Sequence, residues 1–475
     1  MPKDNTWKIE LKNFQAGLSP LAFTSVLTEV GGEGHSSYMK NVDCLDGRLT
    51  QGLGLTDLTA GTQAGAVDQL ISFIMDEAVA SNSSYAIGTT KLFQISSTAV
   101  ANAGIWPHAV TGMADGKSIA YLQGNLYYFF NKASGGDIGK YDLTTTFTDG
   151  WGSSEDAALE KAPHPVDTKE DIMVFGNGQY VGTYIGNSDT LTVQKLDFGT
   201  GSEVADLLFG NNQWYLAVNS GTTGRMKGQI YLWDAGALVA TLADETGVGV
   251  QEIGFIMLIN GVVWMAYRDE TESGFIIGYI SGRQIVPMGR YTGTLPTYQQ
   301  KTLYRGTIMF LSSALVWSAG AIVNEFPFQL SQIGDGGHAT VGGIGSPFGT
   351  PLVASSYTTS FKLSKLTGFL VDAEWHSILF SLVGGLNKGF IDSVTVLTKV
   401  LGANARCDLI VLANQAVNAG ATLQIKGTGI TRHHFTNVGL GGIEDFKIKL
   451  DWSNGNATND CLIRKIIIKG HWSES

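Results

Sequence analysis

The sequence is poor in cysteine and contains no long apolar run. Its three cysteines, Cys44, Cys407 and Cys461, are odd in number and widely spaced, which excludes a disulfide framework and the usual spacings of zinc ligands. Cys407 and Cys461 fall in strand-like segments of one predicted domain and could approach each other, yet we expect all three thiols to be free and reduced. No apolar run reaches the ~18 residues that a membrane-spanning helix needs. Residues 1–13 lack the apolar core of a signal peptide, so we expect neither membrane insertion nor a secretory leader.

Charged residues are scarce, at 15% of the chain, and acidic residues are in excess. The formal net charge is −11, from 31 Lys and Arg against 42 Asp and Glu, and like charges do not gather in blocks. A protein that grips nucleic acid through its phosphates needs the opposite sign. We therefore expect no specific nucleic-acid recognition, although a surface past which nucleic acid slides is compatible with this charge.

Motifs of nucleotide binding and of covalent hydrolysis are missing as well. The sequence contains neither a Walker-type phosphate loop nor a nucleophile elbow. The repeated turn of sialidases is approached only at residues 148–151, with the wrong spacing. A polysaccharide hydrolase needs two facing carboxylates, and nothing pairs the available ones, which are Asp206, Glu252, Asp269 and Glu270. We predict that these are solvated loop acids, that the chain has no catalytic residue, and that it is not an enzyme; the rival hypothesis is a glycan depolymerase.

The histidines do not predict a metal site. His433 and His434 are adjacent, and neighbouring residues of a strand point to opposite faces, so the two rings cannot readily share one ion. The remaining histidines have no companion at ligand spacing; they are His35, His108, His164, His338, His376 and His471. We predict no metal site and no cofactor.

Three aspartates follow the ends of predicted strands. Asp142, Asp197 and Asp234 come after aromatic or aliphatic residues, where a carboxylate either accepts hydrogen bonds from a turn or binds calcium. Turn hydrogen bonding is the commoner role, so we favour it here.

Glycine and apolar residues are plentiful, and they are arranged in meanders. The chain has 61 Gly and 44% hydrophobic residues. The clearest unit is residues 171–199, in which strands at 172–175, 179–185 and 191–198 are separated by Gly- and Asn-containing turns. Such a meander cannot bury its faces alone, which indicates that it packs against further copies.

Similar units recur along the chain. Their first turns fall at Gly88, Gly124, Gly178, Asn212, Gly261 and Gly306. The mean step of about 44 residues is in the range of a propeller blade. We predict an all-β chain with a β-propeller of six or seven blades, and an irregular pair of β-sandwiches is the alternative. Residues 69–75 are expected to form a strand or a short helix, and an early strand of this kind would pair with the last blade and close the ring.

We place the domain boundaries where the composition of the sequence changes. Residues 1–35 are predicted to be an extended N-terminal arm, residues 36–350 the propeller, and residues 351–475 a jelly-roll-like β-sandwich. The clearest strand of the last domain is 446–452, which alternates apolar and charged residues. A hairpin is expected around Asp46-Gly47.

Aromatic residues and long loops are the remaining candidates for binding. Core packing is the favoured role of four tryptophans in or near the blades, and a sugar-stacking platform is the alternative; they are Trp151, Trp214, Trp233 and Trp264. Polar loops at 147–164 and 220–228 are placed to contact partners.

Both ends of the chain resemble a class of tailed-bacteriophage virion proteins. Residues 14–20 (FQAGLSP), 41–43 (NVD), 46–49 (DGRL) and 52–54 (GLG) are similar to the opening of these proteins. Residues 461–470 (CLIRKIIIKG) are similar to the final strand of their sandwich domain. The class combines a β-propeller with a β-sandwich and includes the tail nozzle and related portal-proximal or tail-tip proteins. The chain is short for the nozzle of a short-tailed phage, which leaves the tail station open.

The resemblance implies a structural role in the neck or tail of a virion assembled in the bacterial cytoplasm. One copy would stand in a symmetric ring and contact its neighbours and the portal, adaptor or other tail proteins. An acidic ring around the DNA exit path would not hold the genome, and the N-terminal arm would gain order by docking on a neighbour. The alternative is a receptor-binding or glycan-binding tail-tip protein, and a polysaccharide depolymerase ranks below it.

Overall fold

The protein is built almost entirely of β-strands in the part that the structure describes. The computed structural model describes residues 6–12, 14, 17–18, 24–26, 35–44, 47–60, 67–221, 227–235, 237, 241–242, 250–270, 273–282, 284–320, 329–335, 340–357, 360–370, 372–382, 388–414, 422–456 and 458–472. These residues contain one short helix, α1 (Trp151–Glu155), and the 3-10 turns η2 (Gly186–Ser188) and η3 (Tyr298–Gln300). The all-β prediction is confirmed.

The chain forms two compact units whose boundaries differ from the predicted ones. The first unit comprises Thr56–Leu315 and Gly337–Leu366. The second comprises Met1–Leu55, Val316–Gly336 and Thr367–Ser475. The N-terminal segment thus belongs to the same unit as the C-terminal domain, and the first unit is inserted between them in sequence.

Seven sheets follow one another between residues 55 and 366. The first contains β8 (Thr59–Ala60), β9 (Ile71–Ile74), β10 (Ser84–Gly88), β11 (Lys91–Ile95), β12 (Ala99–Val100) and β13 (His108–Ala109). The second contains β14 (Asp115–Leu122), β15 (Asn125–Asn131), β16 (Gly136–Tyr141) and β17 (Phe147–Thr148). The third contains β18 (Val166–Lys169), β19 (Ile172–Asn177), β20 (Tyr180–Ile185) and β21 (Thr190–Asp197).

The later sheets repeat the same four-stranded order. The fourth contains β22 (Ser202–Gly210), β23 (Gln213–Ser220), β24 (Lys227–Trp233) and β25 (Thr241–Leu242). The fifth contains β26 (Val250–Ile259), β27 (Val262–Asp269), β28 (Phe275–Ser281) and β29 (Gln284–Tyr291). The sixth contains β30 (Lys301–Tyr304), β31 (Thr307–Ser312), β32 (Leu315–Gly320) and β33 (Gln329–Asp335). The seventh contains β34 (Thr340–Gly345), β35 (Leu352–Tyr357), β36 (Ser360–Leu366) and β7 (Leu55–Asp57).

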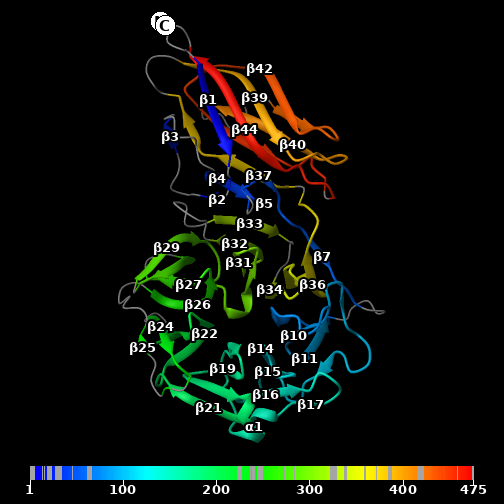
Figure 1. Cartoon of the computed structure of the whole chain (residues 1–475), viewed down its shortest axis with the longest axis vertical. Coiled ribbons are helices and arrows are strands. Elements are labelled where there is room, and N and C mark those ends of the chain that lie inside the picture. The colour runs from blue at the N-terminus through cyan, green and yellow to red at the C-terminus, as the bar shows by residue number, and fades with distance from the viewer. Residues whose placement is uncertain are drawn as a thin grey trace. The chain divides into compact units, whose positions relative to one another are not determined.

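The sheets formed between residues 55 and 366 are arranged around a common centre (Figure 1). β9, β14, β18, β22 and β26 contact one another in succession, β26 contacts η3 beside β30, and β30 contacts β34. β34 in turn lies against β9, so the succession closes. The closure depends on glycine, because a Cβ at Gly342 would lie only 2.1 Å from the carbonyl oxygen of Ile71. The fold is β-propeller-like.

The strand that completes the last sheet is not the predicted one. We expected residues 69–75 to pair with the last blade, but β9 pairs with β10 in the first sheet. The last sheet is completed by β7, and Leu58 N donates to Leu363 O at 2.9 Å beside it. Ile71 and Ile74 of β9 are buried, which suits an innermost strand, whereas the short polar β7 suits an outer edge.

Tight turns account for the recurrence seen in the sequence. The pairs Gln123-Gly124, Asn211-Asn212, Asn260-Gly261 and Arg305-Gly306 all have positive φ, the conformation of a type I′ hairpin turn. Each of these joins the first and second strands of its sheet. Gly88 instead lies at the hairpin between β10 and β11, and Gly178 lies between β19 and β20. Two of the six predicted turns are therefore not equivalent to the others. This explains the uneven spacing.

The second unit contains two sheets around one hydrophobic core. One sheet has the order β1 (Thr6–Lys12), β44 (Ile463–Trp472), β39 (Gly389–Thr398), β42 (Arg432–Ile443). The other contains β2 (Gly17–Leu18), β3 (Thr24–Val26), β4 (His35–Lys40), β37 (Glu374–Ser377), β38 (Leu379–Ser381), β40 (Arg406–Ala413), β41 (Thr422–Lys426) and β43 (Asp445–Asp451). A small hairpin pairs β5 (Val42–Asp43) with β6 (Thr50–Gln51). Asp46 lies outside the described residues, and Gly47 has a φ of 72°.

The alternation predicted for residues 446–452 is confirmed in β43. Phe446, Ile448 and Leu450 are fully buried, as is Trp452 directly after the strand. The intervening charged side chains are partly exposed. The strand therefore presents one face to the core shared by the two sheets.

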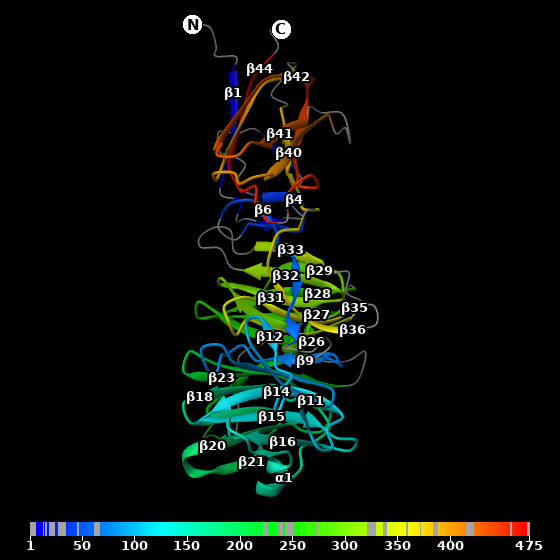
Figure 2. The ribbon, with the colours of Figure 1, turned by 90° about the vertical axis from the view of Figure 1, so that its right-hand side faces the viewer.

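The predicted extended arm is wrong for residues 6–12 and 14. β1 pairs antiparallel with β44, and the two strands lie side by side in both views (Figure 1, Figure 2). Trp7, Ile9 and Leu11 are buried in the core, and the ring of Phe14 meets that of Trp375 edge-on at 5.5 Å. Apolar and polar residues alternate in TWKIELK, the sequence of β1. This pattern indicates a strand with one buried face, so β1 could have been predicted from the sequence.

Candidate functional site

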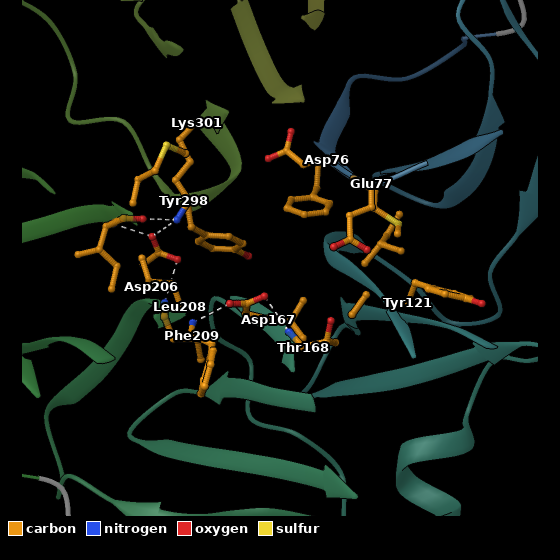
Figure 3. Close-up of a pocket in the computed structure, with 18 of the residues that line it drawn as sticks. Asp76, Glu77, Tyr121, Asp167, Thr168, Asp206, Leu208, Phe209, Tyr298 and Lys301 are labelled. Atoms are coloured by element: carbon orange, nitrogen blue, oxygen red, sulfur yellow. Dashed lines mark hydrogen bonds and ion pairs between the residues drawn. The ribbon is translucent and has the colours of Figure 1, made fainter. Parts of the chain in front are cut away.

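A cavity of about 250 Å³ lies within the first unit. Its wall is formed by residues at or beside β9, β14, β18, β22 and β26, together with Tyr298 and Lys301 (Figure 3). Most of the wall residues are apolar, and four of them are acids, which are Asp76, Glu77, Asp167 and Asp206. A concave apolar pocket with convergent polar groups is the usual form of a small-ligand site.

One of these acids is neutralised by a lysine. Asp206 is 2% exposed and forms an ion pair with Lys301, whose ammonium also donates to the carbonyl oxygen of Ile256 at 2.6 Å. The Asp206 carboxylate accepts the backbone N–H groups of Ile256 at 2.7 Å and Leu207 at 2.9 Å. A buried ion pair is tolerated only when its remaining hydrogen-bonding capacity is met in this way. The pair therefore joins the fourth, fifth and sixth sheets.

Two further acids of the cavity, Asp76 and Asp167, are held by neutral donors. Asp76 accepts the hydroxyl of Thr302 at 2.6 Å and the N–H of Ser346 at 2.8 Å. Asp167 accepts the N–H groups of Phe209 at 2.7 Å and Thr168 at 2.8 Å. Loss of hydration among the surrounding strands raises the pKa of each carboxyl to about 6, and the hydrogen bonds act in the opposite direction.

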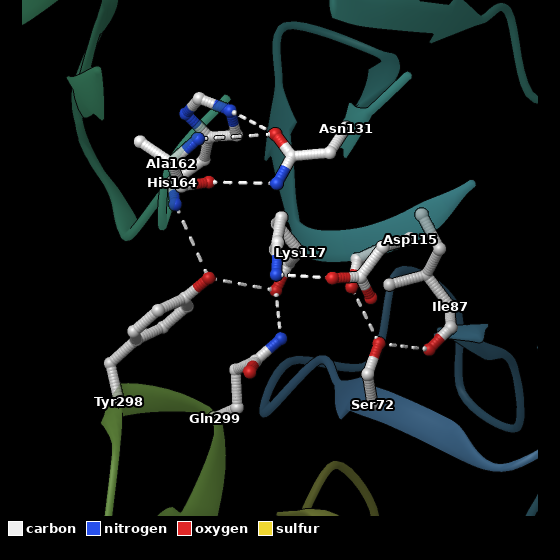
Figure 4. Close-up of polar contacts among 10 residues, drawn as sticks. Ser72, Ile87, Asp115, Lys117, Asn131, Ala162, His164, Tyr298 and Gln299 are labelled. Carbon is white, nitrogen blue, oxygen red and sulfur yellow. Dashed lines mark hydrogen bonds and ion pairs between the residues drawn. The ribbon is translucent and has the colours of Figure 1, made fainter. Parts of the chain in front are cut away.

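A group of polar contacts beside the cavity links η3 to Lys117 and His164 (Figure 4). From η3, the hydroxyl of Tyr298 donates to Lys117 O at 3.2 Å and Gln299 Nε2 donates to the same oxygen at 2.8 Å. The N–H of His164 donates to the Tyr298 hydroxyl at 3.3 Å. The segment before β30 is thereby tied to β14 across the ring.

His164, the histidine of this group, is fully buried. Its Nδ1 lies 3.0 Å from the carbonyl oxygen of Gly176 and its Nε2 lies 3.1 Å from Asn131 Oδ1. Burial lowers the pKa of His164 to about 4, although the bond to Gly176 works in the opposite direction. Burial therefore favours the neutral ring, which carries one N–H and can donate to only one of these two oxygens.

The four acids considered for hydrolysis do not form a carboxylate pair. Asp206 is occupied by Lys301, Glu252 pairs with Arg268 at 3.0 Å, and Asp269 pairs with Arg290 at 2.5 Å. Glu270 is exposed. The interpretation of Asp206, Glu252 and Asp269 as solvated loop acids is wrong, because all three are ion-paired in or at the end of a strand. Neither arrangement offers the acid and base of a glycoside hydrolase.

The two adjacent histidines lie on opposite faces of β42, as predicted. His433 is buried and burial lowers its pKa, whereas His434 is exposed and its Nδ1 lies 2.7 Å from the hydroxyl of Thr395. Among the residues that the structure describes, no three His, Cys, Asp or Glu side chains are grouped so as to hold a metal ion. His338 lies outside the described residues.

Several other histidines pair with carboxylates. His108 lies 2.9 Å from Asp149, and His376 lies 2.6 Å from Glu374. His471 Nδ1 lies 2.8 Å from Asp392. His35 begins β4.

Two of the three strand-end aspartates accept turn hydrogen bonds, as predicted. Asp142 accepts the N–H groups of three successive threonines at 2.9 to 3.0 Å, which lowers the pKa of its carboxyl. Asp197 accepts the N–H of Gly199 at 2.7 Å and the side-chain amide of Gln179 at 2.9 Å. Asp234 accepts the N–H of Ala237 through its backbone oxygen at 2.7 Å.

The tryptophans considered for sugar stacking are core residues. The most exposed of the four retains 6% of its surface, and they are Trp151, Trp214, Trp233 and Trp264. A sugar-stacking platform needs an exposed ring face. These four residues therefore do not provide one, and the prediction of core packing is confirmed.

All three cysteines are buried and free. Burial, together with the neighbouring thiol of Cys461, raises the pKa of the Cys407 thiol. The sequence-based suggestion that Cys407 and Cys461 approach each other is confirmed.

Sequence reasoning missed most of the cavity. Asp206 could be recognised as buried because it interrupts an apolar strand. Asp76 and Asp167 lie at the ends of short apolar segments and look like ordinary strand-end acids. Lys301 is 95 residues from its partner Asp206, and no local signal links them.

No described helix is long and apolar enough to cross a membrane. No protein-family model matches the chain, and no curated protein matches it at a significant level.

Solved structures share the β-propeller-like fold. The extracellular domain of BT4673 from B. thetaiotaomicron is 11% identical, with a TM-score of 0.45, over 74% of this chain and 45% of that one. The present chain thus spans less than half the length of that domain. The WD40 domain of Neurospora crassa Pan2 is 9% identical, with a TM-score of 0.42, over 68% and 96% of the two chains. The N-terminal domain of Nup159 is 10% identical, with a TM-score of 0.39, over 66% and 95%.

Proposed function

We propose that this protein is a structural component of a tailed-bacteriophage virion. One copy would stand in a symmetric ring in the neck or tail, as in a nozzle, and contact neighbouring tail proteins. The proposal extends the fold to a seven-bladed propeller, one blade per sheet, inserted in sequence into a jelly-roll-like β-sandwich. The sheet order and the shared core of the second unit support this description.

The observation that carries the proposal is the joining of the short motifs on which the resemblance depends. Phe14 N donates to Gly47 O at 3.2 Å, and Gly52 N donates to Asn41 O at 2.6 Å. Leu49 and Ile463 exchange two backbone hydrogen bonds, at 3.0 and 2.7 Å. Segments more than 400 residues apart in sequence are thus one hydrogen-bonded element. Motifs that fold together are better grounds for a resemblance than scattered matches.

The absence of a suitable carboxylate pair in the described residues supports a role without catalysis. Of the acids of the central cavity, Asp206 is ion-paired and Asp76 and Asp167 are held by backbone and hydroxyl donors, so these three are not placed as the acid and base of a glycoside hydrolase. Incubation with host surface polysaccharide followed by sizing of the products tests this. We expect no chain shortening; shortening that is lost in Asp206→Asn or Glu252→Gln would establish a depolymerase.

The net charge of −11 supports a place around the DNA path. An acidic lumen repels phosphates and so would let the genome pass without holding it. The docking of a free N-terminal arm no longer supports ring formation, since β1 is part of the core. Ring contacts must instead come from the surfaces of the folded units.

A receptor-binding or glycan-binding tail tip is the second candidate. The burial of the four tryptophans removes the platform that favoured it. Binding of the purified protein to host glycans, with a host-range change on its exchange, would favour the tip. Both candidates require that the chain is part of the virion. Peptide mass spectrometry of purified virions therefore tests both, since a protein outside the particle would not be detected.

A further inference from the structure

The central cavity combines apolar walls with a surplus of negative charge. Phe73, Tyr121, Phe209, Met257 and Leu258 contribute apolar surface to its wall. At about 250 Å³ it is smaller than the ~300–1,000 Å³ of pockets for drug-sized ligands. A ligand that fills it is therefore small or is a single side chain.

Three carboxylates of the cavity have no ion-pair partner among the described residues. Asp206 is matched by Lys301, whereas Asp76, Glu77 and Asp167 make no ion pair there. Asp76 and Glu77 are consecutive residues of the loop after β9, Asp167 lies in β18, and all three border the same space (Figure 3). Their surplus charge calls for a cation.

Among the described residues of this wall, Lys301 is the one lysine or arginine against four acids, and its charge also lowers the pKa of Asp76 and Asp167. Lys169, next to the wall residue Thr168, places its ammonium 5.6 Å from the ring of Phe209 and lies 3.4 Å from Glu170, with which it pairs. The phenol of Tyr298 is neutral, because burial raises its pKa. The ring of Phe209 is thus already near one ammonium, which shows that this wall is compatible with cation–π contact.

Two of the three carboxylates are fixed in position before any ligand arrives. Asp76 is held by Thr302 and Ser346, and Asp167 is held by two backbone N–H groups. Poor hydration raises the pKa of both to about 6. A cation between them would favour the ionised forms, and fixed groups lose little entropy on binding. Glu77 is solvent-exposed, so a ligand can enter beside it.

A chelated metal ion does not fit this arrangement. Calcium and magnesium require several oxygen ligands at 2.0–2.6 Å. The described residues hold no group of three or more acids, histidines or cysteines close enough for that. More widely spaced carboxylates beside aromatic and aliphatic walls suit a cation with an apolar body.

We propose that the cavity binds a primary alkylammonium group. Its methylenes would lie against Phe209, Met257 and Leu258, and its ammonium would lie among Asp76, Glu77 and Asp167. The group could belong to a free amine or to a lysine side chain of a partner protein. The proposal does not depend on the place of the protein in a virion.

Titration of the full chain with n-butylammonium, followed by NMR of the ligand, tests the proposal. We expect saturable binding of n-butylammonium, with 1-butanol and butyrate, of the same length, binding at least about tenfold more weakly. Comparison with Nα-acetyl-lysine methylamide separates the two sources: tighter binding of this derivative indicates a protein-borne lysine, and equal binding indicates a free amine. No saturable binding of n-butylammonium, or equal binding of 1-butanol, would overturn the proposal.

Three variants make the test specific. Asp167→Asn should weaken n-butylammonium binding about tenfold or more, while Glu155→Gln, an exposed acid outside the cavity, should leave it unchanged. Thr168→Lys keeps all three carboxylates but supplies an ammonium from within the wall, so it should abolish binding. Each variant is first checked for an unchanged circular dichroism spectrum. Unaltered affinity in a folded Asp167→Asn or Thr168→Lys protein would refute the assignment.

Discussion

Single side chains that reach from one sheet to another hold the centre of the first unit together. Lys301 crosses to Asp206, and Tyr298 crosses to the backbone of Lys117, 181 residues earlier in the chain. A local pattern could mark Asp206 as buried, but it could not name a partner so distant in sequence. Local sequence patterns therefore predict the fold class, but they do not predict these long-range polar contacts.

His164 makes stability depend on pH. Its pKa is lowered to about 4 from an ordinary 6.5, so between these values the unfolded chain binds more protons than the folded one. Stability contributed at neutral pH is thus lost as the pH falls from about 6.5 toward about 4. Chemical unfolding followed by circular dichroism should show His164→Gln destabilised at about pH 7.5, with the gap to wild type about 2 kcal/mol smaller at about pH 5. A gap that does not change with pH would mean that the pKa of His164 is the same in the folded and unfolded chains.

The cysteines should behave as buried, reduced thiols. Each is 0% exposed, so alkylation of the native protein should add few labels. Alkylation after denaturation without reductant should add three, as measured by intact mass. A bond between Cys407 and Cys461 would leave only one label and would contradict the prediction.

At the scale of elements, the seam between β34 and β9 depends on glycine. A Cβ at Gly342 would lie 2.1 Å from Ile71 O, so the strands must separate to accept it. Gly342→Ala should lower the free energy of unfolding by about 1–3 kcal/mol. The matched control is Gly150→Ala, since its new Cβ would have no neighbour closer than 3.7 Å. Equal unfolding midpoints for the two variants would show that the seam does not hold the ring closed.

β1 should be a stabilising strand and not a detachable arm. Ile9 is 3% exposed and lies opposite Ile468 of β44. Ile9→Ala should lower the free energy of unfolding by about 2–5 kcal/mol. Lys8→Ala, on the exposed face of the same strand, should change it by less than about 0.5 kcal/mol. If the two variants unfold alike, or if removal of residues 1–12 has no effect, β1 is not part of the core.

Short-range patterning explains which elements could be predicted. The Gly- and Asn-containing turns and the alternation in β43 are local features, and both lie where the sequence indicated. The roles of β1, β7 and β9 depend on which strand each one pairs with, far along the chain. Register and partner choice arise from burial over the whole fold, so a single sequence does not determine them.

On the scale of the whole molecule, the chain begins and ends in one unit and forms the other in between. The motifs that resemble phage virion proteins meet in the unit that contains both chain ends. The propeller-like unit supplies a closed ring of sheets with a small acidic cavity. These features suit a protein that works through its surfaces, and the virion proposal depends on them.

The most direct test of that proposal is a reconstruction of the phage particle by electron cryomicroscopy, with the gene product identified in purified virions by mass spectrometry. The structure of each unit can be fitted separately into the density of the neck and tail. We predict density for both units in a symmetric ring around the DNA path. Absence of the protein from purified virions would contradict the central claim, and single or threefold copies at the tail tip would replace the ring with the receptor-binding alternative.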